Sequence, residues 1–231
     1  MCKIIREDIR TALEKDPAAR NSLEVYFTYG GVKAIIRYRV AHKLWNKGWR
    51  FLARLIMARV KNITGIDIHP AAVIGRKIFI DHGMGVVIGE TTEIGDNVTL
   101  YQGVTLGGTG KDTGKRHPTV HDNVMISAGA KVLGPIVIGE GSKIGAGSVV
   151  LKNVPSHCTV VGVPGYVTKM YGQKFNDFDQ KLPDPVLDEF KRIDRRLNAV
   201  EDFTGVQTCR YSIANDVQQF FDPDLHEGEN I

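Results

Sequence analysis

The sequence has few of the features that mark secreted, metal-binding or membrane-spanning proteins. Its 231 residues include three cysteines, Cys2, Cys158 and Cys209, which are far apart and form no Cys-x-x-Cys pair. Scattered thiols of this kind predict neither a disulfide framework nor a zinc site. No apolar run approaches the roughly 20 residues needed to cross a bilayer, and the first residues lack the apolar stretch of a signal peptide. We therefore expect a cytoplasmic protein.

Charge is unevenly distributed along the chain. Residues 1–66 carry 14 Lys and Arg against 5 Asp and Glu, whereas residues 171–231 carry 7 against 13. A basic N-terminal region is compatible with binding to nucleic acid or to a membrane surface. The segment 47–56, however, reads as an amphipathic helix that packs its Trp, Leu and Ile face on neighbouring elements. We expect neither a nucleic-acid partner nor a membrane partner.

Aliphatic residues recur every six positions through the middle of the chain. They are Ile68, Ile74, Ile80, Ile88, Ile94, Leu100, Leu106, Val120, Ile126, Val132, Ile138, Ile144 and Val150, with two longer intervals. Neither an α-helix nor an alternating strand has this period, but a triangular parallel β-helix does, with one hexapeptide on each flat side. Eighteen residues then complete one coil. The pattern predicts a left-handed parallel β-helix over residues 66–167, an exception to the usual right-handed crossover.

Helical patterns precede and follow this repeat. Residues 1–65 predict a helical domain, in which Asp16-Pro17 forms an N-cap with proline in the first turn and Gly48 breaks a longer helix. Residues 168–231 predict an amphipathic C-terminal helix, from about Leu187 to Val200, and a polar, flexible tail. The fold class is therefore α+β, with three domains.

The two longer intervals carry the candidate functional residues, because insertions in a solenoid leave the packed prism and become free to bind and react. Ile80 and Ile88 are eight residues apart, so the segment with Asp81 and His82 contains two extra residues. Leu106 and Val120 are fourteen apart, so residues 107–119 contain a looped-out segment.

His82 has the chemistry of a general base. Asp67 precedes it by fifteen residues, three short of a coil, which predicts that Asp67 lies near His82 on the neighbouring coil. A carboxylate that holds one ring nitrogen leaves the other free to accept a proton near neutral pH. The alternative is a pair of polar residues on a surface bulge.

The looped-out segment contains Arg116 and His117. Arginine is suited to bind a substrate carboxylate through two hydrogen bonds, although a surface loop can also carry arginine for solubility alone. The run Gly107–Lys111 resembles a phosphate loop but lacks the required glycine spacing. A zinc site of His82, His117 and His121, as in β-helical carbonic anhydrases, is disfavoured because Asp81 and Arg116 suit a zwitterionic ligand better than a cation.

At these motifs the sequence resembles bacterial serine O-acetyltransferases. The resemblance covers roughly residues 16–167 and is carried by Asp67-Ile68-His69-Pro70, Asp81-His82, Gly89-Glu90-Thr91, Gln102–Lys111, Arg116-His117-Pro118 and Lys143–Val150. It implies transfer of the acetyl group of acetyl-CoA to the hydroxyl of L-serine, which gives O-acetyl-L-serine for cysteine biosynthesis. Acetyl-CoA is then a co-substrate, and no tightly bound cofactor or metal is expected.

The resemblance also implies roles for individual residues. His82 is the catalytic base and Asp67 orients it, so that the serine alkoxide attacks the thioester directly. The residues implied in serine binding are Asp16, Asp81, Glu90, Arg116 and His117. Those implied along the CoA edge are Gly108, Thr109, Ala128, Lys143 and Ala146.

Two kinds of partner follow from the same resemblance. Each active site is expected between adjacent prisms, so the chain should form a homotrimer or a hexamer. The helical domain is shorter than in the members whose extra helices join two trimers, which favours the trimer. The terminal Ile231 is expected to dock into O-acetylserine sulfhydrylase. Two alternatives stay open, namely a related acyltransferase for another hydroxyl acceptor and a non-catalytic β-helical binding scaffold.

Overall fold

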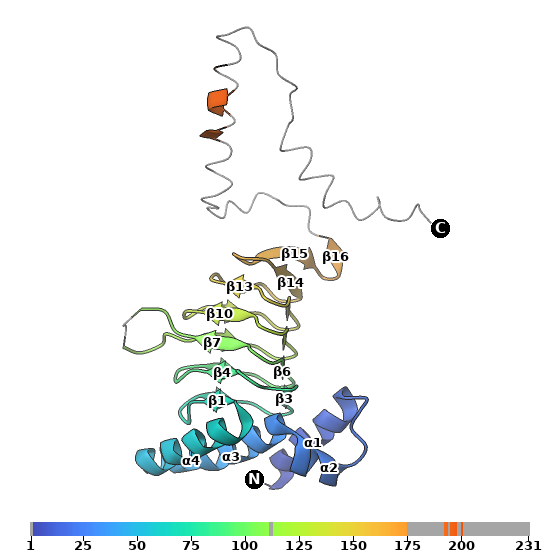
Figure 1. Ribbon diagram of the computed structural model, residues 1–231, viewed down its shortest axis with the longest axis vertical. Helices are drawn as coiled ribbons and strands as arrows, with labels where there is room; N and C mark the ends of the chain where they lie inside the picture. The colour runs from blue at the N-terminus through green and yellow to red at the C-terminus, as the bar shows by residue number, and fades with distance from the viewer. Residues whose placement is uncertain (1, 111–112, 175–191, 194, 198–199, 201–231) are drawn as a thin grey trace, which may run out of the picture. The chain divides into compact units, whose positions relative to one another are not determined.

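The structure is a computed structural model that describes residues 2–110, 113–174, 192–193, 195–197 and 200 (Figure 1). The chain divides into two units, Met1–Lys181 and Leu182–Ile231. In the second unit, the described residues are helical and fall within the predicted C-terminal helix, whereas Ile231 lies outside the described residues. Within the described ranges, no helix is long and apolar enough to cross a membrane.

The described N-terminal residues form four helices, as predicted for this region. They are α1 (Cys2–Lys15), α2 (Ser22–Thr28), α3 (Gly30–Asn46) and α4 (Arg50–Thr64). Gly48 separates α3 from α4 with a φ of 86°, a left-handed conformation that favours glycine. The predicted N-cap at Asp16 is wrong. The helix begins later, at Ser22, because the side chain of Asn21 accepts a 2.9 Å hydrogen bond from the Glu24 N–H.

Helix α4 buries one face and exposes another. Ala53, Met57 and Val60 lie in the core, whereas Phe51 and Leu55 are 83% and 54% exposed. Each exposed residue stands two positions before a buried one, which places it on the opposite side of the helix. The expectation that the Trp, Leu and Ile face packs on neighbouring elements is wrong, within the described chain, for Leu55 and for Trp49, which is 63% exposed.

Residues 67–150 form a three-sided parallel β-helix with one sheet on each side (Figure 1). The first sheet contains β1 (Asp67–Ile68), β4 (Val87–Ile88), β7 (Thr105–Gly107), β10 (Lys131–Leu133) and β13 (Val149–Val150). The second contains β2 (Val73–Ile74), β5 (Glu93–Ile94), β8 (Thr119–Val120) and β11 (Val137–Ile138). The third contains β3 (Phe79–Ile80), β6 (Thr99–Leu100), β9 (Met125–Ile126), β12 (Lys143–Ile144), β14 (Cys158–Val161), β15 (Tyr166–Met170) and β16 (Gln173–Lys174).

Strand pairing confirms the predicted coil and both insertions. Val87 pairs with Thr105, eighteen residues later, and Lys131 pairs with Val149 at the same interval. Asp67 pairs with Val87 after twenty residues, and Thr105 pairs with Lys131 after twenty-six. The extra residues therefore protrude at the corners of the prism, and the parallel pairing of the strands is preserved across both insertions. Each inward aliphatic residue of the six-residue repeat is buried.

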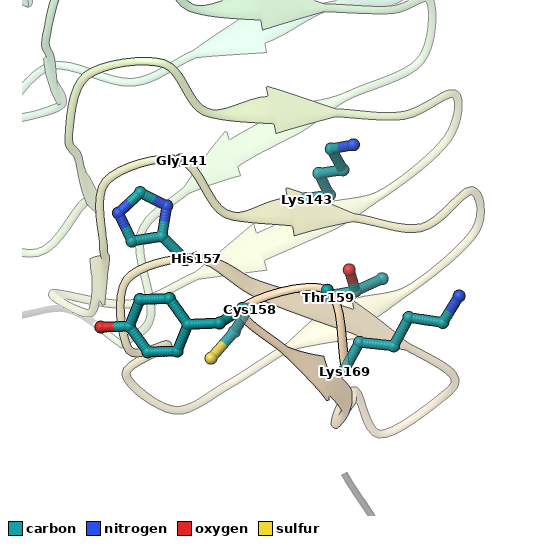
Figure 2. A pocket seen from close by; sticks show the side chains of 8 residues that line it. Gly141, Lys143, His157, Cys158, Thr159 and Lys169 are labelled. Carbon is teal, nitrogen blue, oxygen red and sulfur yellow. The ribbon is translucent and has the colours of Figure 1, made fainter. Parts of the chain in front are cut away.

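The prism ends in an antiparallel ribbon. β15 pairs antiparallel with β14, and β16 pairs antiparallel with β15. Thr159 of β14 lies opposite Lys169 of β15, and both side chains are seen in Figure 2. The reversal follows the turn residues Gly162–Gly165, as expected for the end of the repeat. The ribbon covers the last parallel strand, which would otherwise present unpaired backbone groups.

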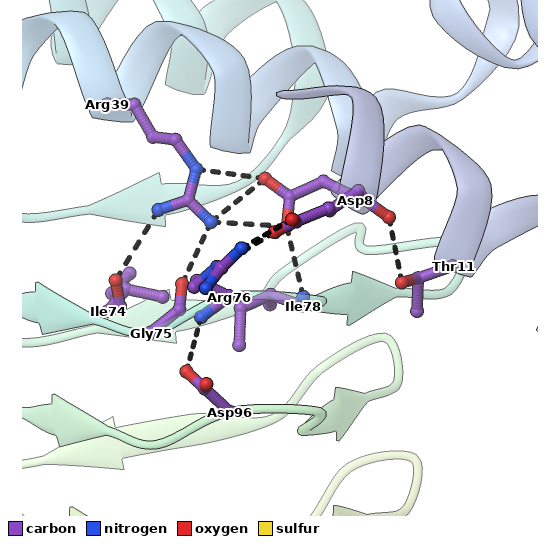
Figure 3. Close-up of polar contacts among 9 residues, drawn as sticks. Asp8, Thr11, Arg39, Ile74, Gly75, Arg76, Ile78 and Asp96 are labelled. Atoms are coloured by element: carbon purple, nitrogen blue, oxygen red, sulfur yellow. Dashed lines mark hydrogen bonds and ion pairs between the residues drawn. The ribbon is translucent and has the colours of Figure 1, made fainter. Parts of the chain in front are cut away.

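A buried ion pair fixes the helices to the prism (Figure 3). Asp8 of α1 and Arg39 of α3 lie 2.8 Å apart, with side chains that are 1% and 9% exposed. Arg39 also donates to the Gly75 carbonyl at 2.8 Å, and Asp8 accepts from the Ile78 N–H at 3.2 Å. Burial raises the pKa of Asp8, and the hydrogen bond from Arg39 opposes that rise. The pair thus joins two helices to the first coil.

Candidate active site

His82 lies in the two-residue insertion at the corner where the third sheet passes into the first. Its φ is 55°, a left-handed conformation that costs a non-glycine residue on the order of 1–3 kcal/mol. Two backbone hydrogen bonds hold this turn. The Gly83 N–H donates to the Asp81 carbonyl at 2.6 Å, and the Gly85 N–H donates to the Gly65 carbonyl at 2.9 Å. The His82 side chain is 76% exposed. The ring therefore points out of the prism, as a base that meets a substrate requires.

Two carboxylates and a tyrosine lie near this ring, and we call these residues the His82 cluster: Asp16, Tyr29, Asp81 and His82. Asp81 Oδ1 is 4.0 Å from His82 Nε2. Asp16 accepts hydrogen bonds from the Tyr29 hydroxyl at 2.5 Å and from the Ala18 N–H at 2.8 Å. These bonds lower the pKa of Asp16, and the nearby His82 charge contributes. The bond to Asp16, with burial and neighbouring carboxylates, raises the pKa of Tyr29 to about 12.

The predicted contact between Asp67 and His82 is absent. Asp67 Oδ2 instead accepts a 2.7 Å hydrogen bond from Lys61 Nζ, and among the described residues no hydrogen bond joins Asp67 to the His82 ring. The residue count along the coil predicted the position of the Asp67 backbone correctly, but not the direction of its side chain. Asp67 opens β1 on the first sheet, two residues after Gly65, whose carbonyl accepts the hydrogen bond that holds the His82 insertion. Both residues therefore belong to one corner without touching.

A second set of predicted residues lies at the next corner, where the first sheet passes into the second. We call it the Arg116 cluster: Glu90, Thr91, Arg116 and His117. Arg116 and Glu90 form a 2.7 Å ion pair between side chains that are 32% and 39% exposed. His117 is 8% exposed. Burial, and then the Arg116 charge, lower the pKa of His117, while Glu90 opposes this.

Thr91 connects the members of the Arg116 cluster, although sequence reasoning gave it no role. Its hydroxyl oxygen accepts hydrogen bonds from the backbone N–H groups of Arg116 and His117, both at 3.1 Å. The same hydroxyl lies 2.9 Å from His117 Nδ1. Its backbone carbonyl accepts a 2.8 Å bond from Lys115 Nζ. One residue thus fixes the end of the looped-out segment.

The two clusters stay apart within one chain. His82 and Asp81 lie where the third sheet passes into the first, whereas Glu90, Arg116 and His117 lie where the first sheet passes into the second. The chain brings the predicted serine-binding residues together in two groups, at two corners of the prism.

Four of the five residues predicted along the CoA edge divide between the same two corners. Ala128 and Ala146 stand at the corner of His82, each followed by a glycine with positive φ, Gly129 and Gly147. The Gly147 N–H donates to the Ala128 carbonyl at 2.8 Å, so these turns stack directly. Gly108 and Thr109 follow β7 at the corner of Arg116, and both are exposed. Small residues at these positions leave the backbone open to a narrow ligand.

Lys143 lies on the third sheet beside a cavity of about 610 Å³ (Figure 2). It pairs with Thr159, which in turn pairs with Lys169, so the three side chains form one row across β12, β14 and β15. In Figure 2 the two lysines extend to the side of the cavity away from His157. Two amines that flank a hydroxyl suit a phosphate group. Lys169 was missed from sequence because it lies beyond the repeat.

The candidate histidines do not gather around a common point. Among the residues that the structure describes, no three His, Cys, Asp or Glu side chains lie close enough to hold a metal ion. His82 and His117 belong to different corners, and His117 Nδ1 is occupied by Thr91.

Comparisons with known proteins give a consistent result. The family model for bacterial transferase hexapeptide (six repeats) matches residues 117–152. The chain is 57% identical over 201 residues to the serine acetyltransferase of Bacillus pumilus, covering 86% of this chain and 93% of that protein. It is 58% identical over 197 residues to that of Bacillus subtilis, covering 84% and 91%. The crystal structure of Neisseria gonorrhoeae serine acetyltransferase in complex with serine matches with a TM-score of 0.71 at 42% identity, covering 73% of this chain and 69% of that chain.

Proposed function

Because this chain belongs to the serine acetyltransferase family and transfers an acetyl group to serine, we propose that His82 is the base that takes the proton from the serine hydroxyl. The observation that supports this role is the position of His82, since its exposed ring stands in an insertion beside the Asp81 carboxylate. Acetyl-CoA is the acetyl donor, and O-acetyl-L-serine and CoA are the products.

The reaction needs one base and no covalent intermediate on the protein. His82 accepts the hydroxyl proton as the serine oxygen attacks the thioester carbonyl carbon. The C–S bond then breaks, and the CoA sulfur takes the proton from the imidazolium. Lys61 holds Asp67 Oδ2 at 2.7 Å, and we propose that this carboxylate turns its other oxygen, Oδ1, to the His82 ring when substrate binds. A carboxylate on the ring N–H also stabilises the imidazolium that forms.

The charges of the two clusters match the two ends of serine. Asp81 and Asp16 are acceptors for its ammonium group, and the pKa of Asp16 is lowered by the Tyr29 hydroxyl, which keeps this carboxylate ionised. Arg116 and His117 are donors for its carboxylate. Glu90, 2.7 Å from the guanidinium, orients Arg116.

A complete site then requires two neighbouring chains, because the clusters stand at different corners of one prism. We propose a homotrimer in which the His82 cluster of one chain faces the Arg116 cluster of the next. Exposed aliphatic residues on the outer faces support such packing: Val73 is 55% exposed, Val87 38% and Val137 36%. We place this assembly in the cytoplasm.

Acetyl-CoA would lie along the same interface. Ala128 and Ala146 let pantetheine approach the corner that carries His82, and Lys143 meets a phosphate group of CoA. Gly108 and Thr109 line the opposite side from the neighbouring chain. This arrangement would place the thioester between the two clusters.

The decisive experiment is a thiol-release assay with acetyl-CoA and a panel of serine, homoserine, threonine and simple sugars. We expect serine to be the preferred acceptor and His82→Ala to lower kcat by about 10²–10⁴-fold, the usual contribution of a general base. Binding of CoA to His82→Ala, measured by calorimetry, should stay unchanged. Equal turnover in that variant would refute the assignment of His82, and preference for a sugar would refute serine as acceptor.

The C-terminal residue is a separate proposal, and it lies outside the described residues. We propose that Ile231 docks into the active site of O-acetylserine sulfhydrylase. Deletion of Ile231 should abolish binding to that enzyme in a sedimentation experiment and leave acetyl transfer unchanged. Retained binding would refute the docking.

A further inference from the structure

We infer that Thr91 is a positioning residue of the serine site, which holds His117 as the neutral tautomer with its hydrogen on Nε2, so that this N–H is presented to the carboxylate of the substrate. The inference rests on the proposed role of His117 in serine binding. It adds a residue and a hydrogen-bond direction that the resemblance to the family does not supply.

The hydrogen-bond inventory of the threonine hydroxyl determines the tautomer. A hydroxyl has one hydrogen and two acceptor lone pairs. Both lone pairs of Thr91 Oγ1 are used by the backbone N–H groups of Arg116 and His117, at 3.1 Å each. Its single hydrogen is therefore left for His117 Nδ1 at 2.9 Å. The Thr91 N–H points to the same nitrogen at 3.3 Å.

Two donors on Nδ1 mean that this nitrogen is an acceptor and carries no hydrogen. A neutral imidazole then has its hydrogen on Nε2. The surroundings favour the neutral ring as well, because it is buried and lies beside the cations Arg116 and Lys115. Glu90 is the opposing charge, but it is paired with Arg116.

The packing of the ring fixes where Nε2 points. A Cβ added at Gly89 would lie 2.1 Å from Nε2, and one added at Gly108 would lie 3.2 Å from it. The imidazole therefore fits between two glycines, and its Nε2 edge faces the exposed Gly108. This is the side on which the looped-out segment begins. A rotated ring would lose the bonds to Thr91.

Thr91 also sets the relation between the two donors for the carboxylate. The backbone N–H groups of Arg116 and His117 both donate to the Thr91 hydroxyl. The hydroxyl therefore fixes the backbone positions from which the guanidinium and the Nε2–H extend. Lys115 completes this clamp, because its amine reaches both the Thr91 carbonyl and Glu93, at 2.8 and 2.9 Å. Arg116 supplies the charge, and His117 adds a directed neutral hydrogen bond.

The test uses the full-length enzyme with Thr91→Val, which keeps the shape but removes the hydroxyl, and with Thr91→Ser, which keeps the hydroxyl. Thr113→Val, an exposed change in the same looped-out segment, is the matched control. We expect Thr91→Val to raise KM for serine about tenfold, as for loss of an oriented hydrogen bond worth about 1.4 kcal/mol. KM for acetyl-CoA should stay unchanged, Thr91→Ser should restore most of the serine affinity, and Thr113→Val should match the wild type.

Nitrogen NMR of histidine-labelled enzyme reads the tautomer directly, with the His117 signals assigned by comparison with His117→Gln. We expect an unprotonated Nδ1 and a protonated Nε2 in the wild type. A proton on Nδ1 would overturn the inference, and so would an unchanged serine KM in Thr91→Val. If Thr91→Val fails to fold, the wild-type tautomer and the Thr91→Ser kinetics still decide. Failure of the proposed function gives a different result, because His117→Gln would then leave the serine KM unchanged whatever the tautomer.

Discussion

The hydroxyl of Tyr29 donates a 2.5 Å hydrogen bond to Oδ2 of Asp16. Tyr29 stands between α2 and α3, and Asp16 stands just after α1, so the bond joins two helix connections. Both residues interact electrostatically with the insertion that carries Asp81 and His82. The Asp16 carboxylate is therefore kept ionised near His82, and it does not cap a helix.

Removal of this hydroxyl should weaken serine binding without removing the base. We expect Tyr29→Phe to raise KM for serine by about three- to tenfold, since a hydrogen bond to a charged group is lost, with little change in kcat. Tyr26→Phe, on the exposed side of α2, is the matched control and should behave as the wild type. Steady-state kinetics with serine varied at saturating acetyl-CoA is the measurement. An unchanged serine KM in Tyr29→Phe would show that the Asp16 carboxylate does not depend on this bond.

The same bond predicts how stability changes at high pH. The pKa of Tyr29 is raised from 10.0 to about 12 in the folded chain, so folding favours its protonated form. This contribution is fully present below pH 10, where the unfolded chain is also protonated, and is lost as pH rises towards about 12. Urea unfolding of the wild type should therefore show a steeper loss of stability over that range than Tyr29→Phe. Parallel profiles for the two proteins would contradict the prediction.

The buried ion pair between the helices and the prism should matter more than a surface pair on the same helix. Asp8→Ala leaves Arg39, whose side chain is 9% exposed, without its carboxylate, which typically costs about 3–5 kcal/mol of unfolding free energy. Glu14→Ala removes the exposed partner of Arg10, whose side chain is 79% exposed, and should cost about 0.5 kcal/mol or less. Urea denaturation measures both. Similar losses in the two variants would mean that Asp8 does not anchor the helices.

The six-residue period of the aliphatic residues predicted most of the β-helical architecture. The recurrence of aliphatic residues at Ile88, Leu106 and their equivalents predicted a left-handed β-helix and located both insertions, and the strand registers and the structural neighbours confirm it. This worked because a solenoid repeats one local rule, and each coil contacts mainly its neighbours.

The positions of side chains were harder to predict. Asp67 was expected on His82 but bonds Lys61, because coil counting places a backbone corner and leaves the side-chain rotamer undetermined. Tyr29 and Thr91 escaped notice, since their partners are thirteen and twenty-six residues away and neither residue forms part of a chemical motif by itself. The Asp16 cap failed because Asn21 offers a competing cap five residues later.

Gly89 provides a steric probe of His117 that leaves every polar residue in place. Its φ is not in the left-handed region, so alanine is compatible with the backbone, but a Cβ would lie 1.9 Å from His117 Cδ2. We expect Gly89→Ala to push the ring away from Thr91 and to raise KM for serine about tenfold, with a small effect on KM for acetyl-CoA. The control is the double variant Gly89→Ala/His117→Gln, analysed as a cycle with the two single variants. If Gly89 acts only through the histidine, the double variant should match His117→Gln alone. A fully additive loss would show instead that the added methyl group disturbs the site by another route.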